Sequence, residues 1–310
     1  MQNTQFSDQY LAAFITKTAS KQTYYTIRFL ADRERVVDAY RAYAYFRWVD
    51  DVLDAGESSG IEQRIFLQRQ KMLLEKSYRG EPVHDICPEE EMLVRLAQND
   101  TEQNSGLQFY LRNMMAVMSF DVQRRGRLIC QAELNRYTRW LAGAVTEAMH
   151  YFIGHDDYSP HNQARPLAVT AAHITHMLRD TFEDIQAGYF NAPREALHVT
   201  HYNELLGVHS SAYRAWVRSR VELARAYFKA GKQYLHQVEN LRCRVAGFAY
   251  IARFEWLLDT IEKEDYCLRP QYNERKSLGT GLRMGWLTLS AMLASRQARV
   301  SSQTISERFL

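Results

Sequence analysis

Residues 40–54 have the sequence YRAYAYFRWVDDVLD, an apolar and aromatic segment that ends in aspartates. Asp50 and Asp54 are four residues apart, so on a helix they share one face, one turn apart. The rings before them predict a buried helix, because solvated helices rarely carry so many aromatic side chains. Acidic pairs at this spacing also occur on solvated helix faces, so one pair alone does not establish a site.

A second acidic pair has the same spacing, in residues 178–184, LRDTFED. Asp180 and Asp184 follow another largely apolar stretch, residues 167–178. Carboxylates beside buried segments carry a large desolvation cost unless metals or partners offset it. Mg²⁺ takes such oxygen ligands and bridges to substrate phosphates. Two such turns facing each other across a helical cavity would hold a diphosphate, whose departure leaves an allylic carbocation.

The composition favours an ordinary globular protein. The chain has 310 residues, of which 46% are hydrophobic and 24% charged. It contains only 6 prolines and 14 glycines and no linker tract, which favours a single domain over residues 1–310. The net charge of +3 is too small to indicate nucleic-acid binding, so we expect no nucleic-acid partner.

The four cysteines are scattered, and none are paired at metal-ligand spacing. This favours free thiols in a reducing cytoplasm. No signal peptide opens the chain and no apolar run reaches about 18 residues, so we expect a cytoplasmic protein that does not span a membrane. Peripheral contact with a membrane, brought about by an apolar substrate, stays open, and the sequence does not indicate the oligomeric state.

Helical periodicity dominates the chain, and alternating strand patterns are hard to find. Glycine and proline residues separate the periodic segments. We therefore expect an all-α bundle with a central cavity. The expected helices span residues 5–20, 32–54, 61–79, 88–99, 102–119, 131–154, 163–187, 208–237, 241–264 and 275–297.

Three separated motifs resemble those of the squalene/phytoene synthase family, the head-to-head prenyl synthases. Residues 43–54, YAYFRWVDDVLD, are similar to the family's first acidic motif, YAFCRxxDDxxD. Residues 118–121 and 133–143, MSFD and ELNRYTRWLAG, are similar to its M-x-x-D and E-L-x-x-Y-x-x-x-V-A-G segments. Residues 178–184 resemble its second motif, LRDxxED. Chance agreement at all three is improbable.

The resemblance implies an all-α class I terpenoid-synthase fold with Mg²⁺, or Mn²⁺ in its place, between two acidic helices. The family's usual reaction joins two prenyl diphosphates through a cyclopropyl intermediate. The residues that fall on the family's metal ligands are Asp50, Asp54, Asp180 and Asp184.

The resemblance also implies roles for three further residues. Arg47 and Arg179 fall where the family has arginines that contact diphosphate, and Tyr137 falls on a tyrosine near the departing diphosphate. Guanidinium groups and a phenol suit the negative charge that develops on a leaving group. Two alternatives stay open: Arg47 forms a salt bridge to Asp51 or Asp54, and Tyr137 is a core residue.

The chain departs from the family just before the second motif, where the family has Gln and Asn and the Asn assists a metal. His173 and His176 stand in their places, on one helical stripe with Asp180. Three interpretations stay open: packing residues, contacts to diphosphate or a metal, or a base that removes a proton from a late carbocation. A substrate-facing role is favoured, which makes both histidines candidate catalytic residues.

Two further departures concern diphosphate binding. Where the family has a serine-rich S-x-S-F segment, this chain has Lys21 and Thr23. Both are candidate phosphate contacts, although Lys21 is equally well explained as a solvated residue. Gln271 replaces a basic residue, and Arg269, Arg275 and Lys276 are close enough in sequence to compensate; of these, Arg275 is a candidate diphosphate contact.

We expect an Mg²⁺-dependent enzyme that ionises a prenyl diphosphate and condenses it head-to-head with a second one. NADPH is required only if the product is squalene-like. Replacements in the cavity, among them Thr146 and Phe254, motivate an alternative in which the same cation is cyclised or transferred to a non-prenyl, for example aromatic, acceptor. A non-catalytic scaffold is a third hypothesis, disfavoured because all four aspartates are present.

Overall fold

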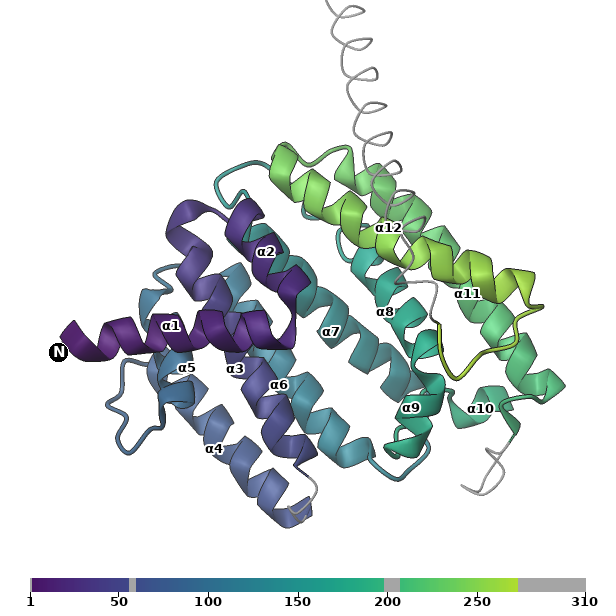
Figure 1. Ribbon diagram of the computed structural model, residues 1–310, viewed down its shortest axis with the longest axis horizontal. Coiled ribbons are helices and arrows are strands. Elements are labelled where there is room, and N and C mark those ends of the chain that lie inside the picture. The colour runs from purple at the N-terminus through teal and green to yellow at the C-terminus, as the bar shows by residue number, and fades with distance from the viewer. Residues whose placement is uncertain (1, 56–59, 198–206, 273–310) are drawn as a thin grey trace, which may run out of the picture. The chain divides into compact units, whose positions relative to one another are not determined.

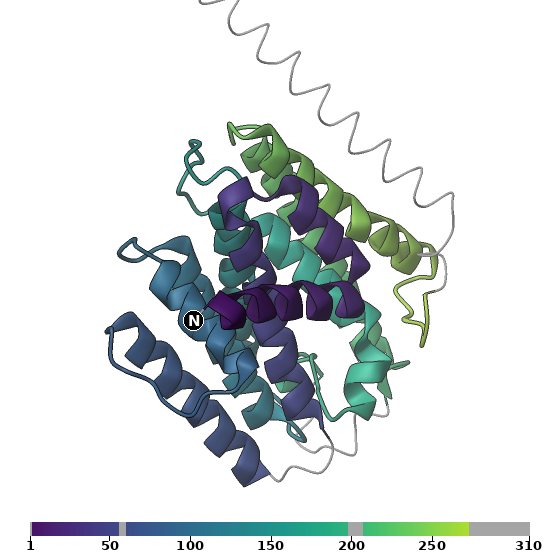
Figure 2. The ribbon, with the colours of Figure 1, turned by 60° about the vertical axis from the view of Figure 1, so that its left-hand side comes forward.

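The structure is a computed structural model that describes residues 2–55, 60–197 and 207–272, with the backbone alone for residues 2–7. Every regular element in these ranges is helical, which confirms the expected all-α class (Figures 1 and 2). The α-helices are α1 (Gln2–Ala19), α2 (Lys21–Leu30), α3 (Val36–Asp54), α4 (Gly60–Tyr78), α5 (Pro88–Asn99), α6 (Gly106–Arg124), α7 (Gln131–Phe152), α8 (Leu167–Arg179), α9 (Thr181–Gln186), α10 (Arg194–Leu197), α11 (Ser211–Leu235) and α12 (Leu241–Lys263).

Most of the expected helices are present. Apart from the short helix α10, which was not expected, there are three differences. No helix was expected over residues 21–30, yet α2 forms there because the Ser20 hydroxyl caps it, accepting a hydrogen bond from the Thr23 N–H at 3.2 Å. The expected helix 163–187 divides at Asp180 into α8 and α9. The expected helix 275–297 lies outside the described residues.

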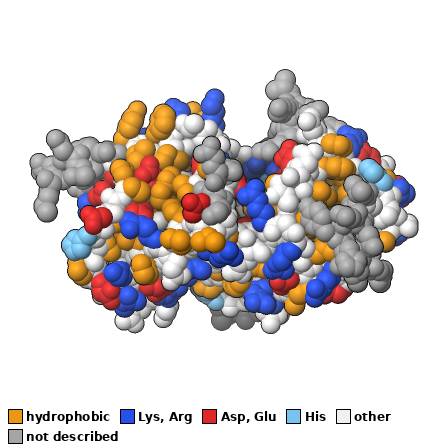
Figure 3. Space-filling view, turned by 90° about the horizontal axis from the view of Figure 1, so that it is seen from below, with side chains coloured by type: hydrophobic (Ala, Val, Ile, Leu, Met, Phe, Trp, Pro, Cys, Tyr) orange, Lys and Arg blue, Asp and Glu red, His pale blue; other side chains and the backbone are white. Residues whose placement is uncertain are grey.

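Charges of both signs surround the hydrophobic side chains that reach the surface (Figure 3). Within the described residues, no helix combines the length and the apolar character needed to cross a bilayer. Several large apolar residues are nevertheless strongly exposed, among them Tyr10, Phe29, Ile61 and Ile65.

The chain divides into two compact units, each described here by itself. The first comprises residues 1–125 and 135–156, and the second comprises residues 126–134 and 157–310. The single domain expected over residues 1–310 stays a prediction.

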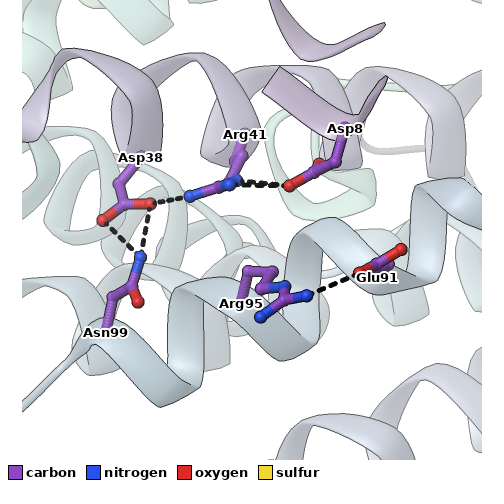
Figure 4. A network of polar contacts seen from close by, with 6 residues as sticks. All are labelled: Asp8, Asp38, Arg41, Glu91, Arg95 and Asn99. Carbon is purple, nitrogen blue, oxygen red and sulfur yellow. Dashed lines mark hydrogen bonds and ion pairs between the residues drawn. The ribbon is translucent and has the colours of Figure 1, made fainter. Parts of the chain in front are cut away.

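In the first unit, α1 packs on α3, and α3 also contacts α5 and α6. A polar network, buried at Arg41 and Asp8 and exposed at Asn99, joins the first three of these helices (Figure 4). Arg41 on α3 donates to the Asp8 carboxylate on α1 at 2.7 and 2.9 Å and to Asp38 at 2.8 Å. Asn99, the last residue of α5, donates to both oxygens of Asp38 at 3.1 Å. The Arg41 and Asp8 side chains are almost wholly buried, so this ion pair fixes the orientation of α1 on α3.

In the second unit, α8 packs against α11 and α12, which also contact each other. Gly231 on α11 permits the close approach to α8, since a Cβ atom there would lie 2.7 Å from the Cβ of Ala168. The faces of α8 that result are largely buried, with Ala171, Ala172 and Thr175 fully enclosed. This packing holds the C-terminal end of α8, where the second acidic motif begins.

Candidate active site in two acidic motifs

The two acidic motifs belong to different units, and the first occupies the C-terminal end of α3. The aromatic residues before it are buried as expected: Tyr40, Tyr45 and Phe46 are all less than 9% exposed. Asp50 is only partly enclosed, with 45% of its side chain exposed, so the motif begins where the buried helix reaches solvent.

Arg47 lies beside these aspartates. Its Nη1 is 3.4 Å from Asp50 Oδ2, and its Nε donates to Asp51 Oδ2 at 3.2 Å. Its Nη2 also bonds Asp51. A salt bridge to Asp51 was one of the two alternatives for Arg47, and it is present here. The role of Arg47 in binding diphosphate stays a prediction.

Negative charge accumulates around Asp50. Burial raises the pKa of Asp50 to about 6, and the charges of Asp54 and Asp121 add to this effect. Burial, with a smaller contribution from the charge of Asp54, also raises the pKa of Asp121 on α6, although the charge of Arg124 and hydrogen bonds from Arg124 and Tyr137 act in the opposite direction. Three carboxylates from two helices therefore repel one another at this end of the first unit.

Asp121 is held by two neighbours. Arg124 Nε donates to Asp121 Oδ1 at 2.6 Å, and the Tyr137 hydroxyl donates to Asp121 Oδ2 at 3.3 Å. The Arg124 guanidinium also lies over the Tyr137 ring, 4.7 Å from its centroid. Tyr137 is therefore buried and hydrogen-bonded, as the core interpretation expects, and its role near a departing diphosphate stays a prediction.

The carboxylates of the first motif fit a divalent cation. Burial is the main cause of the raised pKa values of Asp50 and Asp121, and the charge of Asp54 adds to both, although Arg47 and Arg124 act in the opposite direction. A dication would relieve the remaining repulsion. Oxygen ligands suit Mg²⁺ or Mn²⁺. Over the described part of the chain, no group of three or more His, Cys, Asp or Glu side chains is already arranged to hold a metal ion.

The second motif lies at the junction of α8 and α9. Asp180 has φ −94° and ψ 8°, which interrupts the helix at this residue. The Asp184 N–H still donates to the Asp180 carbonyl at 2.8 Å. The two aspartates therefore remain one turn apart, as the spacing predicted, although the helix that carries them is not continuous.

Arg179 and His176 both contact the first aspartate of this motif. Arg179 donates through Nε and Nη2 to the two oxygens of Asp180, at 2.6 and 2.7 Å. His176 Nε2 lies 3.4 Å from Asp180 Oδ2 and also contacts Arg179. The His176 side chain is about half exposed, and its ring packs edge-on against Phe254 at 6.0 Å. One cation and one imidazole thus flank Asp180.

Two further residues, His173 and Asp184, differ in their surroundings. His173 is only 7% exposed and lies on the buried part of α8, unlike His176. Asp184 accepts a hydrogen bond from Asn191 Nδ2 at 2.6 Å. Burial raises the pKa of the Tyr213 hydroxyl to about 12, and the charge of Asp184 makes a smaller contribution in the same direction.

The candidate phosphate residues Lys21 and Thr23 occupy different faces of α2. Lys21 is exposed, whereas Thr23 lines an apolar cavity of about 220 Å³ in the first unit. The Thr23 hydroxyl shares a hydrogen bond with Ser20 at 2.9 Å. The other walls of the cavity come from α3, α6, α7 and the residues that follow α7. Arg275 lies outside the described residues.

Three residues of these clusters were not assigned roles from the sequence. Asp121 falls within the M-x-x-D segment, so the motif itself was the signal for it. Arg124 follows three residues later, at the spacing of an ion pair on one helical face. Asn191 is seven residues beyond Asp184, in an irregular segment, and no local pattern indicated it.

The all-α fold of the chain is that of the class I terpenoid synthases. Solved structures share this fold. Squalene synthase HpnC from Alicyclobacillus acidocaldarius has a TM-score of 0.67 at 17% identity, over 85% of this chain and 96% of that one. A dehydrosqualene synthase bound to a ligand also has a TM-score of 0.67, at 18% identity, over 96% of this chain and 99% of that one.

Residues 16–278 match the family described as squalene/phytoene synthase, so the chain belongs to that family. The 15-cis-phytoene synthase of Synechocystis sp. is 25% identical over 268 residues, which cover 81% of this chain and 75% of that protein. The presqualene diphosphate synthase of Zymomonas mobilis is 27% identical over 190 residues, 60% of each chain. The chain spans only 57% of phytoene synthase 3 of Zea mays, at 24% identity. The family resemblance is confirmed, and the protein is a prenyltransferase.

Proposed function

We propose that this enzyme condenses two prenyl diphosphates head-to-head and releases diphosphate. The observation that carries the proposal is the set of carboxylates at the end of α3, where Asp50, Asp54 and Asp121 repel one another in a family of prenyltransferases. A divalent cation would stabilise such a cluster by neutralising its charge, and the bound cation would in turn bind a diphosphate. A cytoplasmic location is part of this proposal.

The metal would be held by Asp50 and Asp54 from the first motif and by Asp180 and Asp184 from the second. Bound Mg²⁺ would stabilise the negative charge that develops on the departing diphosphate. The backbone hydrogen bond from Asp184 to Asp180 keeps the second pair one turn apart, while Asn191 orients the Asp184 carboxylate.

The arginines and the tyrosine would act on the leaving group. In ionisation the C1–O bond breaks, and both electrons leave with the diphosphate. Arg179 is held by Asp180 and Arg47 by Asp51, so both guanidinium groups are oriented before substrate binds. Tyr137 is oriented by Asp121, and its hydroxyl is a second donor for the leaving oxygen.

The direct test is incubation with farnesyl or geranylgeranyl diphosphate and Mg²⁺, with and without NADPH, followed by mass analysis of the products. A hydrocarbon or a cyclopropyl diphosphate built from two prenyl units, together with released diphosphate, supports the proposal. Only monomeric terpenes, or no turnover unless a non-prenyl acceptor is added, would contradict it.

A second candidate function is cyclisation or transfer of one prenyl chain to another acceptor. It is favoured by His176, a departure from the family that lies 3.4 Å from Asp180 and packs against Phe254, a second departure. An imidazole here would remove a proton from the cation and form a double bond. In His176→Asn, diphosphate release should continue while the ratio of products changes. An unchanged product ratio would contradict this role.

A further inference from the structure

Four large apolar side chains project from the outer faces of α1 and α2. Tyr10 and Phe14 are one turn apart on α1, Tyr25 and Phe29 are one turn apart on α2, and all four are between 50% and 75% exposed. The rings of Tyr25 and Phe29 stack with centroids 6.0 Å apart. Exposed aromatic residues grouped in this way are typical of an interaction surface rather than of scattered surface residues.

The two helices form one continuous surface. Lys17 lies one turn beyond Phe14 on α1, and its ammonium group is 5.5 Å from the Tyr24 ring centroid on α2. Tyr24 in turn contacts Tyr25 edge-on at 5.3 Å. We call the exposed side chains of Tyr10, Phe14, Lys17, Lys21, Tyr25, Arg28 and Phe29 the α1–α2 face.

The charge of this face is positive. Lys17, Lys21, Arg28 and Arg33 are all exposed. Within residues 8–35, all of which the structure describes, Glu34 is the one exposed carboxylate. Asp8 is buried against Arg41, and Asp32 is buried and accepts hydrogen bonds from the N–H groups of residues 154 and 155. The exposed cations of this segment therefore give its surface a positive potential that few carboxylates of the same segment offset.

The aromatic residues cannot turn inward, because the opposite faces of both helices are already engaged. On α1, Asp8, Ala12 and Thr16 are at most 2% exposed. On α2, Thr23 and Ile27 line the apolar cavity. Helix α2 thus separates an apolar cavity on one side from an aromatic, cationic surface on the other.

We propose that the α1–α2 face docks on an anionic lipid surface. Tyr and Phe rings partition into the interfacial region of a bilayer, and lysine and arginine bind anionic headgroups, so one helical face with both suits this partner. Docking would place α2, and the cavity behind it, next to the phase in which a prenyl chain dissolves. The docking does not depend on the proposed reaction, because vesicle binding is measured without substrate.

A second exposed apolar stripe serves as a matched control. Ile61 and Ile65 on α4 are each 64% exposed and one turn apart, in the same unit. Their neighbours Glu62 and Arg64 are of opposite charge, so this stripe offers apolar area without a positive field. If apolar area alone caused binding to lipid, the two stripes would contribute equally.

The test is flotation of the intact protein with vesicles of phosphatidylcholine alone and with about one third phosphatidylglycerol. We expect binding to the anionic vesicles and little to the neutral ones. The double variants Tyr25→Ser with Phe29→Ser, and Lys17→Glu with Arg28→Glu, should each lower the partition coefficient about tenfold or more. Ile61→Ser with Ile65→Ser should leave it unchanged.

Circular dichroism and thermal unfolding establish that each variant is folded before it is compared. The proposal is overturned if the intact protein does not float with anionic vesicles, or if the α4 variant loses as much binding as the α1–α2 variants. It is also overturned if sedimentation velocity shows that Tyr25→Ser with Phe29→Ser converts a dimer to a monomer while vesicle binding is absent. That result would assign the face to a second copy of the chain.

Discussion

Asp50 is ionised at neutral pH in surroundings that favour the neutral acid. Burial and the nearby carboxylates raise its pKa to about 6, although Arg47 lies 3.4 Å away. Strongly shifted pKa values are more frequent at functional sites, such as those that bind cations, than at residues with a purely structural role. The sequence placed Asp50 on one face with Asp54, and the structure adds Asp121 as a third charge.

Asp50→Asn should lower diphosphate release about a thousandfold or more, because it removes a metal ligand and one of the charges that attract the cation. Release of diphosphate from a prenyl diphosphate is the measurement. Asp51→Asn is the control, since Asp51 is exposed and bonds Arg47, and it should cost less than about tenfold. Equal losses of diphosphate release in the two variants would contradict the assignment of Asp50 as a metal ligand.

The raised pKa of Asp50 also predicts how stability depends on pH without metal. An acid whose pKa is higher in the folded state contributes stability below its unfolded pKa, near 3.8, and loses that contribution as pH rises through about 6. Asp50→Asn should therefore be more stable than the wild type at pH 7 to 8, and the difference should vanish near pH 4. Urea unfolding in chelator-containing buffer at several pH values measures this. A less stable variant at pH 8 would contradict the assignment.

At the scale of single elements, the start of α7 depends on Glu133. Its carboxylate accepts from the Cys130 N–H at 2.9 Å and from Arg127 at 2.7 Å, so it caps the helix from its third residue. The ion pair with Arg127 is the main reason that its pKa is lowered to about 2. The same helix carries Tyr137 and continues to the cavity wall.

Glu133→Gln should lower the free energy of unfolding by about 1 kcal/mol at pH 7, because the charged hydrogen bonds to Arg127 and the helix start are weakened. The wild-type contribution is present above about pH 4.5 and is lost as pH falls towards 2, so the difference should shrink in acid. Denaturant unfolding measures both. Glu222→Gln removes an exposed pair with Arg218 and should have little effect.

Gly231→Ala should destabilise the packing of α11 on α8. The added Cβ would lie 2.7 Å from Ala168 Cβ and 2.9 Å from its backbone, and this crowding costs about 1–3 kcal/mol, more than the roughly 1 kcal/mol gained in helix propensity. Thermal unfolding measures the loss. In the control Gly60→Ala, the nearest atom to the new Cβ is 3.9 Å away, so no loss is expected.

At the scale of the whole molecule, the proposed function requires both acidic motifs to act on the same ions. Mg²⁺ with inorganic diphosphate should then raise the melting temperature, because ligands that bind only the folded state stabilise it. Asp50→Asn and Asp180→Asn should each abolish the rise. If each single variant retained part of it, the motifs would bind metal independently and the shared site would be wrong.

Much of the fold was predictable because helices are local structures. The 3.6-residue period identified α3, α5, α7 and α12 nearly to their ends, since each has a continuous buried face. The period failed for α2, which has no buried residue and begins only because Ser20 caps it. It also did not indicate the break at Asp180, where the motif itself looks helical.

The all-α class, the family and the spacing that places each aspartate pair one turn apart could be predicted, since these depend on residues close in the chain. The groups that surround those pairs could not, because they come from distant parts of the chain. Asp121 lies on another helix but near enough for the charge of Asp54 to raise its pKa. Asn191 donates a hydrogen bond to Asp184 from an irregular segment. The aromatic side chains of α1 and α2 are exposed. Such contacts join residues far apart in sequence, and their geometry follows from how whole helices pack rather than from any local pattern.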